Sequence, residues 1–256
     1  MELGLSGRVA AITGGGRGLG LAIATTLARE GCRIAICGRT PATLEAARAR
    51  LVAEGAQVLI QACDVTGPGQ VEAFVESAAN HFGGLGVLVH NAGGASGSGA
   101  LETPDDAYRE GFSLNALAGL RAARAAVPWM RRARGGRIIF IASIYGRESG
   151  GRAAYNLAKA AEISLARALA RELAPEGILV NAVAPGSLMF PGSSWERRRE
   201  QDPAGIEAFT RSELPLGRFG SAEEVADVVA FMASDRASLV TGACWTVDGG
   251  QSRSLI

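Results

Sequence analysis

Three side chains in the middle of the chain could together carry out proton chemistry at a carbonyl oxygen. Tyr155 and Lys159 are four residues apart, and Ser143 lies twelve residues upstream. Residues i and i+4 share one face of a helix, so the phenol and the ammonium would project in the same direction. A free tyrosine titrates near pH ~10, and one cation at ~4 Å supplies about 4 kcal/mol, enough to bring that value about three units lower. Lys159 is placed to be that cation, and Ser143 to donate a hydrogen bond to a substrate oxygen, although the same spacing also occurs on solvated helix faces.

A glycine-rich loop near the N-terminus is typical of a turn that binds a nucleotide. It reads Thr13-Gly14-Gly15-Gly16-Arg17-Gly18-Leu19-Gly20 and lies between a predicted strand and a predicted helix. Glycines let the backbone approach a pyrophosphate closely, and a helix N-terminus favours negative charge. The residues expected to contact the cofactor are Gly14, Gly16, Arg17, Gly18, Leu19 and Gly20.

The end of the second predicted strand indicates which dinucleotide binds. The strand is followed by Gly38 and Arg39, with no acid to hold a ribose 2′-hydroxyl. Arg39 and Arg17 could instead bind a 2′-phosphate, because a guanidinium fork matches phosphate oxygens. We therefore predict NADP rather than NAD; the alternative is that one or both arginines are merely exposed.

Short apolar runs alternate with segments of helical composition along the whole chain. The runs are continuously apolar, which suits strands covered on both faces, and the alternation predicts β-α-β units with right-handed crossovers. We predict a single α/β domain over residues 1–256, a doubly wound Rossmann fold whose seven-stranded parallel sheet has helices on both faces. The predicted strands are Val9–Thr13, Ile34–Cys37, Gln57–Cys63, Val87–His90, Arg137–Ala142, Leu179–Val183 and Cys244–Val247. The predicted helices are Leu19–Glu30, Ala42–Glu54, Gly69–Phe82, Arg109–Arg132, Ala153–Leu173 and Ala222–Ala233.

Residues 187–216 break this alternation. The segment is rich in proline and glycine around a basic, helix-like run at residues 195–200. It is too long for an ordinary connection, and it follows the carboxyl end of a strand, where open α/β sheets bind ligands. We predict that it forms a substrate lid.

Composition and charge exclude several classes of function. The chain has 26 basic and 25 acidic side chains, so nothing indicates a nucleic-acid partner. Two histidines without metal spacing and four cysteines without a C-x-x-C pair argue against a metal site and for free thiols in a reducing compartment. No apolar run is long enough to span a bilayer and no signal peptide is recognisable, so we expect a cytoplasmic protein without a membrane segment.

The ordered set of motifs resembles the short-chain dehydrogenase/reductase family. The set comprises the glycine-rich loop, Asp64-Val65, Asn91-Ala92-Gly93, Asn115, Ser143, Tyr155 with Lys159, Pro185-Gly186 and Val247-Asp248-Gly249-Gly250. The resemblance covers residues 7–250. Within the family, the chain looks most like the 3-oxoacyl-carrier-protein reductases and their many relatives.

The resemblance implies a role for each matched residue. Asp64 and Val65 would contact the adenine, and Asn91, Ala92 and Gly93 would lie beside the adenine ribose. Asn115 would hold a helix kink and a water that relays protons to Lys159, and Lys159 would also bind the nicotinamide ribose. Pro185, Gly186 and Leu188 would lie against the nicotinamide. Without the resemblance, Asp64 could be a helix N-cap, Asn115 an ordinary buried amide and Ser143 a group that completes a strand end.

Three positions depart from the family pattern. His90 stands where the family often has asparagine, and we interpret it as a tolerated neighbour rather than a catalyst. Phe190 stands where a threonine often contacts the nicotinamide amide, which suggests a more apolar pocket mouth. Glu176 stands where carrier-protein reductases tend to have a basic residue; the basic run at residues 131–134 could still dock an acidic carrier or be a solvated helix end.

The resulting hypothesis is NADP-dependent hydride transfer between nicotinamide and the carbonyl or secondary alcohol of a small, neutral substrate. The catalytic residues would be Asn115, Ser143, Tyr155 and Lys159. One alternative is an NAD-dependent sugar, polyol or cyclic alcohol dehydrogenase, and another is a dinucleotide-binding sensor or scaffold without turnover. The segments 109–132, 153–173 and 245–250 resemble the parts through which the family forms homodimers and homotetramers.

Overall fold

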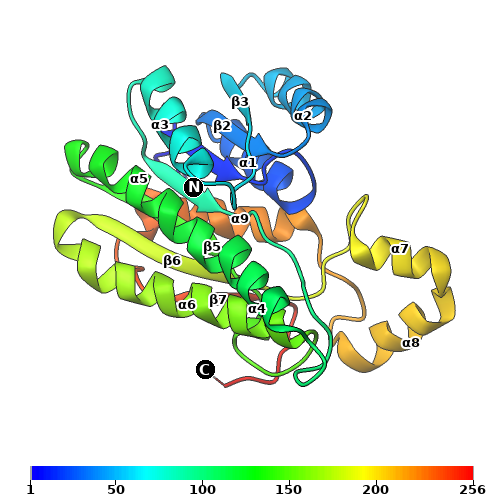
Figure 1. Ribbon diagram of the computed structural model, residues 1–256. Helices are drawn as coiled ribbons and strands as arrows, with labels where there is room; N and C mark the ends of the chain where they lie inside the picture. Colours follow the sequence, from blue (N-terminus) through cyan, green and yellow to red (C-terminus); the bar gives the residue numbers. More distant parts are fainter. Residues whose placement is uncertain (1, 256) are drawn as a thin grey trace.

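The sheet of the protein has seven parallel strands in the order β3-β2-β1-β4-β5-β6-β7 (Figure 1). The computed structural model describes residues 2–255. The strands are β1 (Val9–Thr13), β2 (Arg33–Gly38), β3 (Val58–Ala62), β4 (Val87–His90), β5 (Gly136–Ile141), β6 (Ile178–Pro185) and β7 (Cys244–Val247). The strand order reverses beside β1, and such a switch point opens a crevice at the carboxyl ends of β1 and β4. The predicted doubly wound fold is confirmed.

Helices cover both faces of the sheet and enclose two separate cores. The helices are α1 (Gly18–Arg29), α2 (Pro41–Ala53), α3 (Gln70–Phe82), α4 (Asp105–Phe112), α5 (Ala118–Arg132), α6 (Ala153–Leu173), α7 (Ser194–Gln201), α8 (Pro203–Glu213) and α9 (Ala222–Ala233). One core packs α3, α5 and α6 against the sheet around Phe74 and Phe140. The other packs α1, α2 and α9 around Ile12 and Leu27. The continuously apolar strands are therefore buried on both sides, which is why they carry no alternating pattern.

Small residues bring helix α5 close to the sheet. A Cβ added at Gly119 would lie 2.6 Å from the Phe140 ring and 2.7 Å from the His90 ring. Both rings are completely buried. Glycine at this position therefore lets the start of α5 lie directly on the end of β4, beside the crevice.

The helix expected over residues 109–132 begins earlier than expected and is interrupted at the residue where the family resemblance implies a kink. The helical segment begins earlier, at Asp105, and a π-helical turn at Ser113–Leu117 separates α4 from α5. No proline or glycine marks this turn. Its cause is tertiary, because the Asn115 side chain donates to the Gly111 carbonyl and also bonds both backbone groups of Gly94 in a neighbouring loop.

The predicted lid segment contains two helices: α7 coincides with the helix-like run at residues 195–200, whereas the sequence did not indicate α8. Helices α7 and α8 project beyond the body of the sheet (Figure 1). Side-chain oxygens of Ser193 and Asp202 cap them, and the Trp195 ring packs against Phe209 and Phe219 at centroid distances of 4.6 and 5.1 Å. The segment therefore has a small apolar centre of its own. Separately, no helix among residues 2–255 is long and apolar enough to cross a membrane.

Candidate active site

The glycine-rich loop lies at the switch point and leads directly into α1. Gly14 and Gly18 have φ angles of +66° and +54°, which L side chains rarely adopt. A Cβ at Gly20 would lie 2.2 Å from the Gly14 carbonyl oxygen, so the loop and the first turn of α1 touch through backbone alone. No acidic side chain lies in the first turn of α1, and no side chain caps its N-terminus. The partial positive charge of this helix end is thus available to a phosphate.

The loop forms the floor of a cavity of about 910 Å³. Arg17 and Arg39 both line this cavity, and both are exposed. Within residues 2–255 neither guanidinium has a salt-bridge partner. Two cations without an ion-pair partner among the described residues therefore line this cavity. Arg39 lies just after β2, where the sequence has no acid to hold a ribose 2′-hydroxyl.

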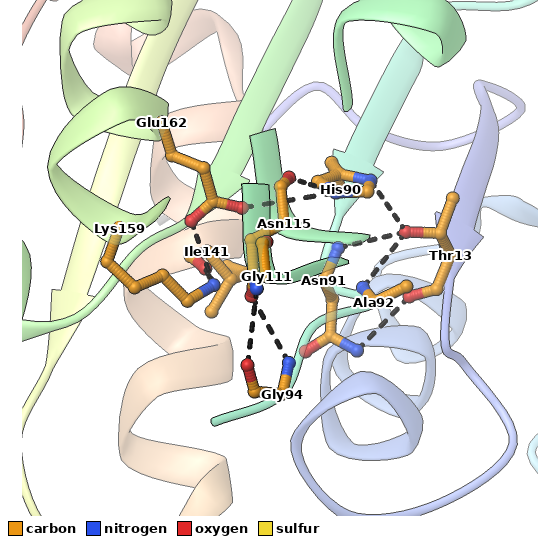
Figure 2. Close-up of polar contacts among 10 residues, drawn as sticks. All are labelled: Thr13, His90, Asn91, Ala92, Gly94, Gly111, Asn115, Ile141, Lys159 and Glu162. Carbon is orange, nitrogen blue, oxygen red and sulfur yellow. Dashed lines mark hydrogen bonds and ion pairs between the residues drawn. The ribbon is translucent and has the colours of Figure 1, made fainter. Parts of the chain in front are cut away.

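The end of β4 holds the loop in place through Thr13 and Asn91. The Asn91 side chain donates to the carbonyls of Thr13 (3.1 Å) and Gly14 (3.2 Å). In return, the Thr13 hydroxyl oxygen accepts the backbone N–H groups of Asn91 and Ala92 at 3.1 and 3.0 Å. Figure 2 shows the bonds between Thr13, at the end of β1, and Asn91 and Ala92, which follow β4. Asn91, Ala92 and Gly93 also line the cavity.

Asp64 and Val65 lie at the far end of the same cavity. The Asp64 carboxylate accepts the backbone N–H and the hydroxyl of Thr66, at 3.0 and 2.7 Å. These bonds, together with the charge of Arg39, lower the pKa of Asp64. Asp64 therefore stays ionised and closes the turn after β3 rather than capping α3, whose N-cap is Gly69.

A second cavity, of about 850 Å³, adjoins the first. The two share Leu19, Asn91, Gly93, Phe190, Ser193 and Ser194 as lining residues. Ser143, Tyr155 and Lys159 all line the second cavity, so the fold brings the three side chains of the proton-transfer hypothesis together. The Ser143 Oγ accepts the Tyr145 N–H at 3.2 Å, which leaves its own hydrogen available to donate into the cavity.

Lys159 is buried, and its ammonium group is held at two points. Nζ donates to the Ile141 carbonyl and to Glu162 Oε2, both at 2.8 Å. It lies 5.7 Å from the centre of the Tyr155 ring. Burial alone would lower the pKa of Lys159, but the nearby Glu162 and Tyr155 outweigh it and the pKa is raised. The lysine is therefore a fixed cation beside the phenol.

Asn115 connects the π-helical turn to the loop after β4. Its side-chain amide donates to Gly111 and Gly94 carbonyls at 2.8 and 3.2 Å, and its Oδ1 accepts the Gly94 N–H at 3.1 Å (Figure 2). A Cβ at Gly93 would lie 2.5 Å from Asn115 Oδ1 and 3.1 Å from Lys159 Nζ. The Asn115 main-chain carbonyl lies 2.9 Å from His90 Nε2. The relay water expected from the resemblance stays a prediction.

The segment after β6 forms the wall between the two cavities. Pro185, Gly186 and Leu188 line the second cavity. The Phe190 ring lies over the glycine-rich loop, since a Cβ at Gly18 would come within 2.6 Å of it. Phe190 lines both cavities. An aromatic ring thus stands where the family often has a threonine.

The structure also adds residues that the sequence analysis did not identify. Arg152, Arg198 and Asp202 line the second cavity, which is therefore more charged than its predicted apolar character. Glu162 is completely buried beside Lys159. The lining residues from the lid depend on tertiary placement and left no local signal. Glu162 did leave one, because an acid three residues after a lysine shares its helix face.

Comparisons with known proteins agree with this architecture. The sequence profile of a family described as "Enoyl-(Acyl carrier protein) reductase" matches residues 14–252. The chain is 36% identical over 250 residues to a 3-oxoacyl-acyl-carrier-protein reductase of Escherichia coli strain K12, covering 97% of this chain and 98% of that one. It is 35% identical, over the same shares, to 2-(S)-hydroxypropyl-CoM dehydrogenase 3 of Xanthobacter autotrophicus.

A solved structure extends the similarity to three dimensions. L-sorbose reductase from Gluconobacter frateurii, determined with NADPH and L-sorbose, superposes with a TM-score of 0.94 at 36% identity over the full length of both chains. Sequence, fold and the arrangement of the two cavities therefore all indicate the same family. The chain belongs to the short-chain dehydrogenase/reductase family, in the branch that resembles the 3-oxoacyl-acyl-carrier-protein reductases, and is an oxidoreductase that acts on CH–OH or C=O groups.

Proposed function

We propose that the protein is an NADP-dependent oxidoreductase that interconverts a carbonyl and a secondary alcohol in a small, neutral substrate. The observation that carries the proposal is the meeting of two cavities, one with unpaired arginines and one with Ser143, Tyr155 and Lys159. A preference for NADP would favour the direction of reduction.

The residues of the first cavity fit a dinucleotide with a 2′-phosphate. The glycine-rich loop offers bare backbone and an uncapped helix N-terminus to the pyrophosphate. Arg17 and Arg39 would bind the 2′-phosphate, because charge-assisted bonds from a guanidinium are strong and directional. Asp64 and Val65 would contact the adenine, and Asn91, Ala92 and Gly93 the adjoining ribose. Pro185, Gly186 and Leu188 would lie against the nicotinamide.

The side chains of the second cavity would transfer the proton to and from the substrate oxygen. When bound, the nicotinamide supplies a hydride to the carbonyl carbon, or accepts one from the alcohol carbon. Ser143 donates a hydrogen bond to the substrate oxygen, and Tyr155 gives that oxygen its proton as the alcohol forms. Lys159 stabilises the tyrosinate that remains and holds the nicotinamide ribose, while Asn115 fixes the loop that faces it. Solvent returns the proton to Tyr155.

The charges in the second cavity are compatible with a neutral substrate. The Arg198 guanidinium lies over the Trp195 ring at 4.9 Å, and Asp202 accepts the Gly205 N–H at 2.9 Å. Both groups thus have partners within the lid itself, whereas Arg152, which also lines the cavity, forms no ion pair among residues 2–255. An acidic carrier protein is less favoured as the substrate carrier, because Arg131 forms an ion pair with Glu176 and Arg132 stacks on Trp129 at 4.4 Å.

A ketose or polyol is the second candidate substrate. One structure that is similar to this chain over its full length was determined with L-sorbose, a neutral sugar. The polar rim of the second cavity, with Ser187, Ser193 and Gln201, offers hydrogen-bonding groups to hydroxyls. L-sorbose therefore belongs in the substrate panel beside simple ketones and β-keto esters.

Turnover of this panel with NADPH tests the proposal, with Tyr155→Phe as the decisive variant. The variant should lose at least about 1,000-fold in kcat, because the proton donor is removed, while NADPH binding stays nearly intact. Tyr108→Phe is the matched control, since the Tyr108 hydroxyl bonds the Ala100 carbonyl and lines neither cavity. Full activity of Tyr155→Phe would overturn the mechanism, and absence of NADPH and NADH binding to the wild type would favour a non-catalytic role.

A further inference from the structure

We propose that Glu162 is a positioning residue: its buried carboxylate is the counterion of Lys159 and sets the pH range over which Tyr155 exchanges its proton. The inference rests on the proposed function, since it concerns the same proton transfer. Glu162 lies outside both cavities and touches neither substrate nor cofactor space. It would therefore act through Lys159.

The contact between the two side chains is direct and shielded from water. Glu162 Oε2 accepts a hydrogen bond from Lys159 Nζ at 2.8 Å, and both side chains are at least 96% buried. Figure 2 shows the carboxylate and the Ile141 carbonyl occupying two of the three donor directions of the ammonium. The third direction is left for the cavity, where Tyr155 lies.

The second carboxylate oxygen is an unpartnered polar atom in the core. Glu162 Oε1 is buried and has no hydrogen-bond partner among the described residues. It faces His90 Nε2 at 3.9 Å (Figure 2). A carboxylate in this position is costly unless a cation compensates its charge, so its presence in the core needs an explanation beyond packing.

His90 does not supply that cation. The Thr13 hydroxyl oxygen already accepts two backbone N–H groups from the loop after β4, so its own hydrogen goes to His90 Nδ1 at 3.1 Å. The ring proton is then on Nε2 and is donated to the Asn115 carbonyl. Burial, with the charge of Lys159, lowers the pKa of His90 to about 3. A neutral imidazole therefore faces Glu162, and Lys159 is left as its counterion.

The carboxylate opposes the effect of the lysine on the phenol. Burial raises the pKa of Glu162 to about 7, with Lys159 acting in the opposite direction. Above that pH the ion pair is neutral as a whole, so it stabilises a tyrosinate less than a lone ammonium does. A nearby negative charge raises the pKa of every neighbouring group, because it favours the protonated form. Removing this charge must therefore shift the proton transfer to lower pH.

Few other charges act on the pair. Lys159 and His90 are the titratable neighbours of Glu162, and Tyr155 acts on Lys159. Of the strands packed against α6, β5 presents the Ile141 carbonyl to Lys159, and its one charged residue, Arg137, bonds Gly136, Ser234 and Asp235 instead. Strand β6 carries no charged residue, and the short helix Ile144–Gly146 carries Tyr145. The charged residues of the adjoining α4, which are Asp105, Asp106, Arg109 and Glu110, are exposed.

The test is the pH dependence of kcat in Glu162→Gln. Glutamine keeps the size and an oxygen for Lys159 Nζ but removes the charge. The whole profile should move toward lower pH by about one unit, with NADPH affinity unchanged. Glu172→Gln, the same exchange at an exposed position of the same helix, should leave the profile in place. An unmoved profile in folded Glu162→Gln, or a shift to higher pH, would overturn the proposal.

An ultraviolet titration follows the proton exchange of Tyr155 without requiring turnover. The chain has three tyrosines, and the ultraviolet titration step that disappears in Tyr155→Phe belongs to Tyr155. That step should move to lower pH in Glu162→Gln and in Glu162→Met, which fills the space without charge. If the wild type turns over no substrate, the proposed function fails while this titration still decides the role of Glu162. Failure of both variants to fold would count against the proposal, because a group that acts through its charge tolerates replacement by a side chain of similar size.

Discussion

In the proposed mechanism, Ser143, Tyr155 and Lys159 are three residue types that acquire a joint chemistry from their surroundings. Each is common on protein surfaces, but here Ser143 and Lys159 are buried and all three line one cavity. Their spacing in the sequence was sufficient to predict that they meet. The spacing of Lys159 and Glu162 is also that of neighbours on one helix face, but only the fold shows that both side chains are buried together.

Arg39 is the residue on which the choice of cofactor depends most. In Arg39→Asp the 2′-phosphate loses a charge-assisted partner and meets a like charge, so NADPH should bind at least about 100-fold more weakly. NADH should bind as well as to the wild type or better, since a carboxylate there can accept a ribose 2′-hydroxyl. Fluorescence titration of both cofactors measures the two constants.

The matched control for this exchange is Arg48→Asp. Arg48 is equally exposed, lies on α2 outside both cavities and pairs only with Glu45 at 3.5 Å. Its replacement should leave both affinities unchanged. A wild type that prefers NADH would refute our interpretation of Arg17 and Arg39 and direct the substrate search toward alcohol and sugar oxidation.

At the scale of elements, α9 illustrates a helix whose start is held by charge. Ser221 and Glu224 form a capping box, and Glu224 also accepts both arms of the Arg218 guanidinium at 2.6 and 2.9 Å. These bonds, that from Arg218 foremost, lower the pKa of Glu224 from 4.5 to about 2. A lowered pKa means that the carboxylate stabilises the fold above pH ~4.5, and that this contribution fades as the pH falls toward 2.

The variant Glu224→Gln should therefore show a pH-dependent loss of stability. Because Glu224 is about half exposed, the free energy of unfolding at pH 7 should fall by no more than about 1 kcal/mol. The difference from the wild type should shrink between pH 4.5 and pH 2 and vanish below. Urea unfolding at pH 7, 4.5, 3 and 2 measures it, with the neighbouring exposed Glu223→Gln as control. A difference that persists at pH 2 would contradict the assignment to charge.

The elements that the sequence predicted well are those whose signal is local. The strands Val9–Thr13, Val87–His90 and Cys244–Val247 and the helices Ala153–Leu173 and Ala222–Ala233 have the expected boundaries. Their apolar runs end at polar or small residues that also end the element. The break in the helix at Asn115 was expected only from the family resemblance, because it depends on bonds to a distant loop. Helix α8 left no local signal either, since its Phe209 packs in an aromatic cluster centred on Trp195.

At the scale of the whole molecule, the first cavity, our proposed cofactor site, joins parts that are far apart in the sequence. The first cavity is lined by the loop before α1, the ends of β2, β3 and β4, the π-helical turn and the lid. Residues from both halves of the sheet and from α7 thus line the same cavity. Assembly into a homodimer or homotetramer stays a prediction from the family resemblance.

Cofactor binding should therefore stabilise the entire fold and not one loop. At a free concentration of 100 times its dissociation constant, a ligand specific for the folded state adds about 2.7 kcal/mol. For a chain of this size, that corresponds to a rise in Tm of roughly 5–10 °C.

NADPH should produce this rise in the wild type and NADH, at equal concentration, a smaller one. In Arg39→Asp the order should reverse, while Tyr155→Phe should respond like the wild type because it lacks only the proton donor. A thermal unfolding scan of the three proteins with each cofactor measures all six shifts. Equal shifts in Tm for both cofactors in the wild type would show that Arg17 and Arg39 do not bind the 2′-phosphate, even if turnover with NADPH is found.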